Sequence, residues 1–149
     1  MHDLRALYQE VVIDHGRRPR NFGELQPHSH HAHGYNPLCG DKLELFLQVD
    51  DGKITDAKFQ GEGCAISMAS ASLFTEALKG KTPEEAEVLF RDFQDMTMNS
   101  DSPPDMDKMG KLAVLAGVRE FPTRVKCATL AGHTVHAALN NADEPVKTE

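Results

Sequence analysis

The chain has 149 residues, of which 40% are hydrophobic and 26% are charged, and its formal net charge is -7. This length and composition suit a single domain spanning residues 1–149, and the negative charge argues against general binding of nucleic-acid phosphates. Neither a bilayer-spanning apolar run nor the apolar segment of a secretory signal is found, so we expect a cytoplasmic protein that binds no membrane.

The first half of the chain predicts a helix followed by a small antiparallel sheet. Apolar residues at helical spacing predict a helix over residues 3–16. Residues 29–36 fit an edge strand, and residues 43–49 alternate apolar and polar side chains as a half-buried strand does. The Asp-Asp-Gly sequence at 50–52 has the chemistry of a hairpin turn, so residues 54–60 are expected to form the return strand.

The second half of the chain predicts helices and the segments that join them. Residues 94–104, which are rich in Asn, Ser, Asp and Pro, are expected to form a loop, and residues 140–149 a flexible tail. The whole chain therefore has an α+β fold class, with a small three-stranded antiparallel sheet packed against several helices. The predicted helices cover residues 65–79, 82–93, 105–120 and 127–139.

Three cysteines stand far apart in the sequence, each at the boundary of a predicted element. Cys39 lies in a Pro- and Gly-flanked turn between two strands, and Asp41 follows two residues later. Cys64 and Cys127 each open a predicted helix, where the partial positive charge lowers the pKa of a thiol. An odd number of cysteines does not suit a disulfide framework. A single cysteine is most often a buried apolar residue, but the positions of these three favour thiolates that bind metal or react.

Three thiolates and a carboxylate make a four-coordinate ligand set suited to Zn²⁺, with Zn–S distances of ~2.3 Å. The carboxylate is the hardest ligand of that set and the easiest to replace. Cys39, on the exposed turn, is the candidate for the thiolate that leaves the metal and attacks sulfur. The spacing alone leaves open a purely structural zinc site, and also a zinc hydrolase, which needs a water position beside the metal.

Three short motifs carry these residues: Gly-Tyr-Asn-Pro-Leu-Cys-Gly-Asp at 34–41, Gly-Glu-Gly-Cys-Ala-Ile-Ser at 61–67 and Arg-Val-Lys-Cys-Ala-Thr-Leu at 124–130. They resemble the three cysteine motifs of the IscU/NifU-type iron–sulfur cluster assembly family, and the resemblance covers nearly the whole chain. Lys126 stands where the scaffold branch has a histidine, and the stretch between the second and third cysteines is long. Both features resemble the SufU-type branch of zinc-dependent sulfur-transfer proteins.

This resemblance implies that Cys39, Asp41, Cys64 and Cys127 bind zinc. It also implies that Cys39 accepts persulfide sulfur from a pyridoxal-phosphate-dependent cysteine desulfurase of the SufS type, for passage to a downstream iron–sulfur scaffold. Arg124 matches a SufU-type arginine and is expected to act at this site, pairing with Asp41 when the site opens. The chain is then a sulfurtransferase-like carrier rather than an independent enzyme. The alternative is a scaffold for a transient [2Fe–2S] cluster.

The histidines and one glycine lead to further expectations. Residues 28–33 contain four histidines, which leaves metal binding open against the commoner case of a solvated loop or edge strand. His15, on an apolar helical face, is expected to be buried and hydrogen-bonded, whereas His133 and His136 are expected to be packing or surface residues. Gly132 stands where the resemblance predicts a tryptophan, so we expect looser packing there.

Overall fold

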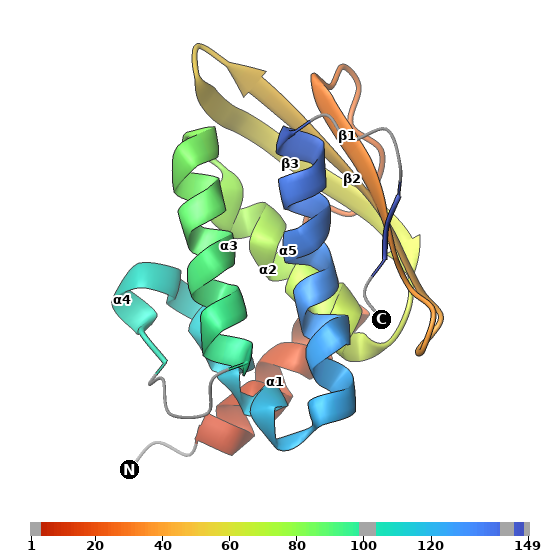
Figure 1. Cartoon of the computed structure of the whole chain (residues 1–149), viewed down its shortest axis with the longest axis vertical. Coiled ribbons are helices and arrows are strands. Elements are labelled where there is room, and N and C mark those ends of the chain that lie inside the picture. The colour runs from red at the N-terminus through yellow and green to blue at the C-terminus, as the bar shows by residue number, and fades with distance from the viewer. Residues whose placement is uncertain (1–3, 99–103, 141–144, 148–149) are drawn as a thin grey trace.

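A computed structural model describes residues 4–98, 104–140 and 145–147, and places a sheet on one side of a set of helices (Figure 1). The turn between the second and third strands holds Asp51 and Gly52 at φ values of 51° and 77°, the backbone conformation that Asp-Gly favours in tight hairpins. The predicted antiparallel sheet is confirmed. Its strands are β1 (His30–Asn36), β2 (Asp41–Asp50) and β3 (Lys53–Glu62).

A short fourth strand, β4 (Val146–Lys147), pairs parallel with β1 and completes the order β3-β2-β1-β4. The prediction of a flexible tail over residues 140–149 is therefore wrong for this segment, while residues 141–144 and 148–149 lie outside the described part of the chain. Val146 packs against the hydrophobic core. The pairing also covers backbone groups at the edge of β1, which an unpaired strand would leave exposed.

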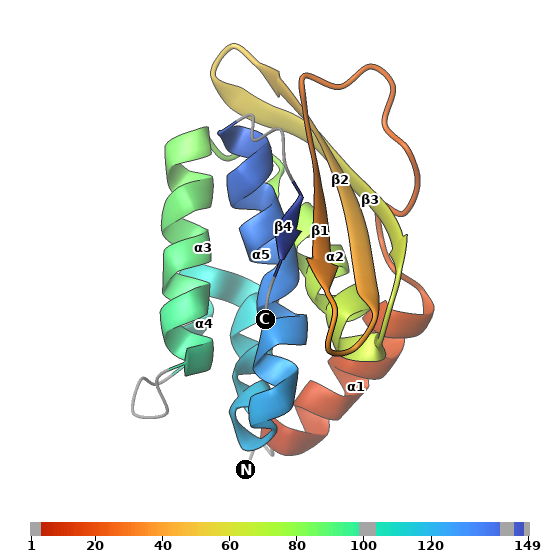
Figure 2. The same cartoon turned by 45° about the vertical axis from the view of Figure 1, so that its right-hand side comes forward.

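Helices cover one face of this sheet, as Figure 2 shows. The four long helices are α1 (Leu4–Arg17), α2 (Ala65–Leu78), α3 (Pro83–Met98) and α5 (Val125–Leu139). Helix α5 packs on β1 and β2, α2 packs on β3, α1 lies along α2, and α3 lies along α5. Leu43, Leu45 and Leu47 of β2 are buried toward the helices, because alternate side chains of a strand share one face.

Helix α3 is longer than predicted. It extends to Met98, into the loop expected over residues 94–104, since Phe93 and Met96 continue the buried side of the helix. Residues 99–103 lie outside the described part of the chain. The burial of apolar side chains therefore keeps the residues that directly follow Phe93 helical, although their composition is typical of a loop.

The single helix predicted over residues 105–120 is in fact two elements. A short helix, α4 (Met106–Met109), is followed by a 3₁₀ helix over Gly110–Glu120. Gly110 ends α4 with a φ of 55°, a conformation that glycine adopts without a steric penalty. The apolar residues that predicted the helix are nevertheless core residues, as expected: Leu112, Leu115 and Val118.

The expectations for His15 and Gly132 have opposite outcomes. His15 is buried and its Nδ1 lies 2.7 Å from Ser72 Oγ, which confirms a satisfied core histidine; burial lowers its pKa. The expected loose packing at Gly132 is wrong. A methyl group there would lie 2.8 Å from Phe90 Cε1 and 3.3 Å from Phe74 Cζ, so two aromatic rings occupy the space.

Three parts of the fold meet at one end of the molecule: the loop that joins β1 to β2, the start of α2 and the start of α5 (Figures 1 and 2). In the described ranges of the chain, no helix combines the length and apolarity needed to span a bilayer. Residues close in sequence fix where a helix begins. Cys64, for instance, caps α2 by accepting a hydrogen bond from the Ser67 amide at 3.4 Å. The meeting point of these segments holds the predicted site residues.

Candidate metal centre

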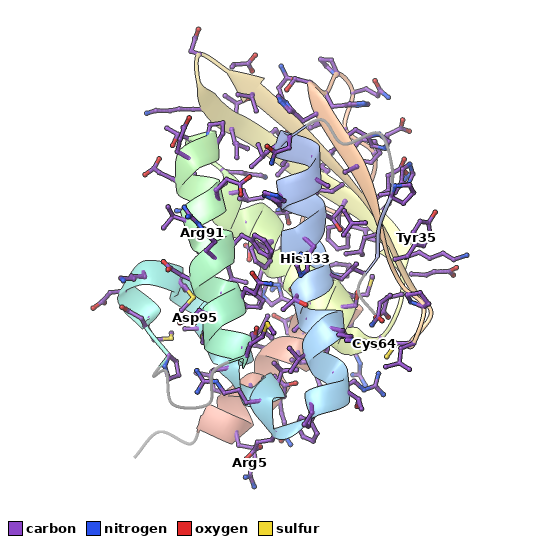
Figure 3. All side chains as sticks on the ribbon, in the orientation of Figure 1. Arg5, Tyr35, Cys64, Arg91, Asp95 and His133 are labelled. Atoms are coloured by element: carbon purple, nitrogen blue, oxygen red, sulfur yellow. The ribbon has the colours of Figure 1, made fainter. Side chains whose placement is uncertain are left out.

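Four side chains, which we call the thiolate cluster, converge here from three segments: Cys39, Asp41, Cys64 and Cys127. Cys39 lies in the turn after β1, and Asp41 is the first residue of β2. Cys64 is the N-cap of α2 (Figure 3). Cys127 does not open its helix as predicted but lies in the first turn of α5, which begins at Val125.

Three ligand atoms of the thiolate cluster lie close enough to share one ion, and the fourth, Cys64 Sγ, lies beside Asp41. Cys39 Sγ and Cys127 Sγ are 3.2 Å apart. The ligand atoms of Cys39, Asp41 and Cys127 all lie within 4.8 Å of one another. Cys64 Sγ is 4.0 Å from Asp41 Oδ2. The fold thus brings together the four residues that the motifs singled out, and their role as metal ligands stays a prediction.

The Asp41 carboxylate is almost completely enclosed. It is 1% exposed, and its Oδ1 accepts a hydrogen bond from the Cys64 amide at 2.9 Å. Gly63 permits this approach, because a Cβ at that position would lie 2.5 Å from Asp41 Oδ1. A buried carboxylate is unfavourable unless hydrogen bonds or a cation compensate it. The backbone is therefore shaped around a charged group rather than around an apolar one.

Asn36 contacts the same carboxylate and was not among the predicted site residues. It is fully buried, and its Nδ2 donates to Asp41 Oδ2 at 3.1 Å and to Cys127 Sγ at 3.3 Å. Among the described residues, its Oδ1 has no hydrogen-bond partner. The sequence signal that points to Asn36 is a polar residue at an inward-facing strand position, directly before Pro37. Asn36 thus holds the carboxylate and one sulfur in a fixed relation.

Arg124 lies beside the exposed side of the cluster. Its Nη1 is 3.4 Å from Cys39 Sγ, and it ends the 3₁₀ turn Pro122–Arg124 that leads into α5. The pKa of Arg124 is raised, first by a hydrogen bond with Cys127 and then by the charge of Cys39. The guanidinium therefore contacts Cys39 in this structure, and its pairing with Asp41 in an opened site stays a prediction.

Protons are unevenly distributed among these thiols. A hydrogen bond from Cys127 lowers the pKa of Cys64 to about 6, although burial opposes this, and the Ser67 amide contributes further. The pKa of Cys127 is raised because its thiol is the donor of the hydrogen bond with Cys64 and because the thiol is buried. At neutral pH this arrangement has a thiolate at Cys64 and a thiol at Cys127. A cation that binds all the sulfurs as thiolates must displace a proton.

The chemistry of this donor set fits a borderline-soft divalent ion. Three thiolates and a carboxylate are ligand types found in four-coordinate zinc sites, whereas Mg²⁺ and Ca²⁺ prefer oxygen ligands. In a tetrahedral zinc site with Zn–S bonds of about 2.3 Å, the sulfurs lie about 3.8 Å apart. The 3.2 Å between the sulfurs of Cys39 and Cys127 needs only a small opening to reach that spacing.

A family model described as the NifU-like N terminal domain matches residues 7–128. This match includes every member of the thiolate cluster and most of the sheet and helices. The chain belongs to this family. The resemblance to IscU/NifU-type proteins that the motifs predicted is thereby confirmed.

Individual relatives of this NifU-like protein cover most of its length. It is 44% identical over 129 residues to the zinc-dependent sulfurtransferase SufU of Bacillus subtilis (strain 168), with 87% of this chain and 86% of that protein covered. It is 40% identical over 139 residues to the iron–sulfur cluster assembly scaffold protein IscU of Streptococcus pyogenes serotype M1, with 93% and 86% covered.

A solved structure shares the fold of this NifU-like protein. FiSufU of Fervidobacterium islandicum AW-1, named as an iron–sulfur cluster assembly scaffold protein for the SUF system, superposes with a TM-score of 0.82 at 32% identity. The superposition covers 91% of this chain and 98% of that chain. The predicted fold class, an antiparallel sheet packed against several helices, is confirmed.

The two histidines of α5 take part in packing and surface contacts, as expected. The His133 ring packs edge-on against Phe90, with ring centroids 4.9 Å apart, and burial lowers its pKa. His136 Nδ1 lies 2.6 Å from Glu87 Oε2 on α3. Both therefore join α5 to α3 rather than contribute to the thiolate cluster.

Proposed function

We propose that this protein is a zinc-bound sulfur acceptor in iron–sulfur cluster assembly, which takes persulfide sulfur from a cysteine desulfurase and passes it on. The observation that carries the proposal is the position of Cys39, a half-exposed turn residue whose sulfur lies 3.2 Å from that of buried Cys127. The name of the Bacillus subtilis relative, a zinc-dependent sulfurtransferase, supports the same function.

Cys39, Asp41, Cys64 and Cys127 are the residues that would hold the zinc ion. Bound zinc would keep the ligating sulfurs deprotonated at neutral pH. The chain itself supplies the support: Asn36 and the Cys64 amide hold the two carboxylate oxygens of Asp41 through hydrogen bonds of 3.1 and 2.9 Å. Such supporting contacts orient metal ligands and strengthen metal binding.

Cys39 is the proposed nucleophile. Its thiolate attacks the outer sulfur of a persulfide on the donor enzyme, so that a new S–S bond forms at Cys39. The S–S bond within the donor breaks, and the donor cysteine leaves as a thiolate. Arg124, 3.4 Å from the Cys39 sulfur, stabilises negative charge there before the attack and on the persulfide afterwards.

The proposed donor is a pyridoxal-phosphate-dependent cysteine desulfurase of the SufS type, and the proposed acceptor is a downstream iron–sulfur scaffold. The cofactor of the desulfurase performs the cleavage of the carbon–sulfur bond of cysteine. This chain supplies the receiving thiol and thus acts as a carrier rather than as an independent enzyme. Leu38, 66% exposed beside Cys39, offers an apolar contact to the donor at the point of transfer.

A desulfurase assay with free cysteine tests the proposal. In the presence of a SufS-type desulfurase, the wild-type protein should acquire one sulfur atom, detected by intact-protein mass spectrometry, and should accelerate cysteine turnover. Cys39→Ala should lose both effects because the receiving sulfur is missing. If this variant acquires sulfur and stimulates turnover as well as wild type does, the proposal is wrong.

Two arginine variants separate sulfur acceptance from a change in net charge. Arg124→Ala should accept sulfur more slowly, because Cys39 loses its neighbouring positive charge. Arg91→Ala, which removes an exposed arginine of α3, should accept sulfur at the wild-type rate. Equal losses in the two variants would show that the contact with Cys39 is not the cause.

The second candidate function is a scaffold on which a [2Fe–2S] cluster is built. The name of the Streptococcus pyogenes relative favours it, and thiolates of this kind also ligate iron. Anaerobic reconstitution with iron and sulfide distinguishes the two functions. A stable, transferable cluster with easily displaced zinc supports the scaffold, whereas retained zinc without a transferable cluster supports the sulfur acceptor.

A further inference from the structure

A second group of ligand-type side chains lies on the outer face of the sheet, and we call it the histidine cluster: His31, His33 and Glu44. His31 and His33 occupy alternate positions of β1, and Glu44 is the residue of β2 that pairs with His33. Since alternate side chains share one face of a strand, these three lie opposite the face that the helices cover, where Ala32 and Leu43 are buried.

The ligand atoms of the three side chains in the histidine cluster lie close together. His31 Nε2 lies 2.7 Å from Glu44 Oε2, and His33 Nε2 lies 3.5 Å from the same oxygen. All three ligand atoms lie within 4.8 Å of one another. Four histidines stand between residues 28 and 33, and the register of the hairpin selects these two.

Neighbouring residues fix the orientation of the cluster. Gln60 on β3 donates to the other carboxylate oxygen, Glu44 Oε1, at 2.6 Å, which leaves Oε2 directed at the imidazoles. The His31 ring stacks on Phe46, with centroids 5.0 Å apart and planes at 28°. Hydrogen bonds and packing of this kind are the contacts that orient metal ligands in proteins.

The charge of the cluster also favours a cation. The ordinary pKa of a glutamate carboxyl is well below 7, so Glu44 supplies negative charge at neutral pH. A hydrogen bond between His31 and Glu44 does not account for a second imidazole directed at the same oxygen, and two protonated imidazoles would repel each other. A metal ion between neutral imidazoles and the carboxylate satisfies all three groups.

We propose that His31, His33 and Glu44 form a second metal site, which takes a first-row divalent ion such as Zn²⁺. Two imidazoles and one carboxylate are the ligands of zinc sites that keep further coordination positions open. Tetrahedral bonds of about 2.0–2.2 Å place ligand atoms about 3.3–3.5 Å apart. The contact between His33 and Glu44 already has that spacing, and the contact between His31 and Glu44 needs a slight opening.

This site is separate from the thiolate cluster and goes beyond the proposed function. Glu44 lies three residues after Asp41 on β2, a distance of about 10 Å along a strand, and their side chains lie on opposite faces of the sheet. The His33 side chain is 45% exposed, so the open positions face solvent. An ion held there is available to exchange with solution or with a ligand, whereas two donors of the thiolate cluster, Asp41 and Cys127, are buried.

Isothermal titration of zinc chloride into tag-free protein already loaded with one equivalent of zinc tests this proposal. Wild type should bind a second equivalent more weakly than the first. The double variant His31→Ala, His33→Ala should lose the second equivalent and keep the first, and the retained first equivalent shows that it is folded. The proposal is overturned if wild type binds no second equivalent, or if the double variant still binds it.

Two single variants make the test specific. His30→Ala changes the neighbouring histidine, whose Nδ1 lies 2.8 Å from Ser29 Oγ, and should bind the second equivalent as wild type does. Gln60→Ala removes only the support of Glu44 and should weaken that equivalent by roughly 10-fold to 100-fold, the usual effect of losing a supporting contact. If His30→Ala abolishes the second equivalent, the ion is held elsewhere among the histidines and the proposal is wrong.

Discussion

The hairpin of β1 and β2 carries two clusters of ligand-type side chains that are assembled in different ways. The histidine cluster draws all its members from the hairpin itself, and strand register alone brings them together. The thiolate cluster draws Cys39 and Asp41 from the hairpin, but Cys64 and Cys127 come from the starts of α2 and α5. The first cluster therefore needs two paired strands, whereas the second needs the whole fold.

The two clusters also differ in enclosure and in donor chemistry. Asp41 is 1% exposed and Cys127 is fully buried, so two donors of the thiolate cluster are shielded from solvent, whereas all three members of the histidine cluster are partly exposed. Buried thiolates must lose protons to bind a metal and then hold it tightly. We therefore expect tight, proton-coupled binding at the thiolate cluster and weaker, exchangeable binding at the histidine cluster.

The largest expected effect comes from Cys127→Ser. This change removes the sulfur that contacts Cys39 and Asn36, and zinc affinity at the thiolate cluster should fall by more than about 100-fold, beyond the effect of losing a supporting contact. Competition against a chromogenic chelator measures the affinity. The histidine cluster should bind zinc as before, and unchanged affinity at the tight site would contradict the ligand role of Cys127.

Zinc affinity at the thiolate cluster should also depend strongly on pH. The raised pKa of Cys127 means that its proton is present through the neutral range, so zinc must displace it, and affinity should rise about tenfold per pH unit for each displaced proton. Below about pH 6 the dependence should steepen, because Cys64 then also carries a proton. Chelator competition from pH 5 to 8 gives the slope, and a flat profile would contradict these proton positions.

A smaller effect is expected for Asn36→Ala. Its amide contacts both Asp41 and Cys127 without being a proposed ligand, so zinc affinity should fall by roughly 10-fold to 100-fold. Asn140→Ala, at the far end of α5, is the matched control and should bind zinc normally. If the two variants bind zinc equally well, Asn36 does not support the metal centre.

The smallest expected effect concerns thermal stability. At a free zinc concentration ten times its Kd, the histidine cluster should add about 1.4 kcal/mol to the free energy of unfolding. For a chain of this size that corresponds to a rise of about 3–6 °C in Tm. The first equivalent of zinc should raise Tm more, because it joins the hairpin to α2 and α5. Differential scanning calorimetry at zero, one and two equivalents of zinc measures both rises in Tm. A larger rise for the second equivalent than for the first would contradict the expected order of the two clusters.

Local sequence patterns predicted most of the sheet and the long helices. The Asp51-Gly52 turn adopts the conformation that its residue types favour, and the alternation along β2 matches its buried face. The prediction failed where packing overrode local preference. Met96 is buried and extends α3 beyond its expected end, and Gly110 divides a segment whose apolar spacing suggested one helix.

The metal centre, too, was predicted from the sequence only in part. Three motifs singled out Cys39, Asp41, Cys64 and Cys127, because cysteines at turns and helix starts have an identifiable chemistry. Asn36 was not predicted, because a polar residue at an inward-facing strand position does not reveal its partners, and only the structure shows its contacts with Asp41 and Cys127.

The sequence by itself determined the α+β class, the hairpin turn and the residue types able to bind zinc, since these follow from side-chain periodicity and donor chemistry. Only the tertiary structure decided that Cys127 lies 3.2 Å from Cys39, that Asn36 holds Asp41, and which two histidines share Glu44. The physical reason is that a ligand set is a matter of distances between atoms. Residues remote in the chain acquire such distances only when helices and strands pack together.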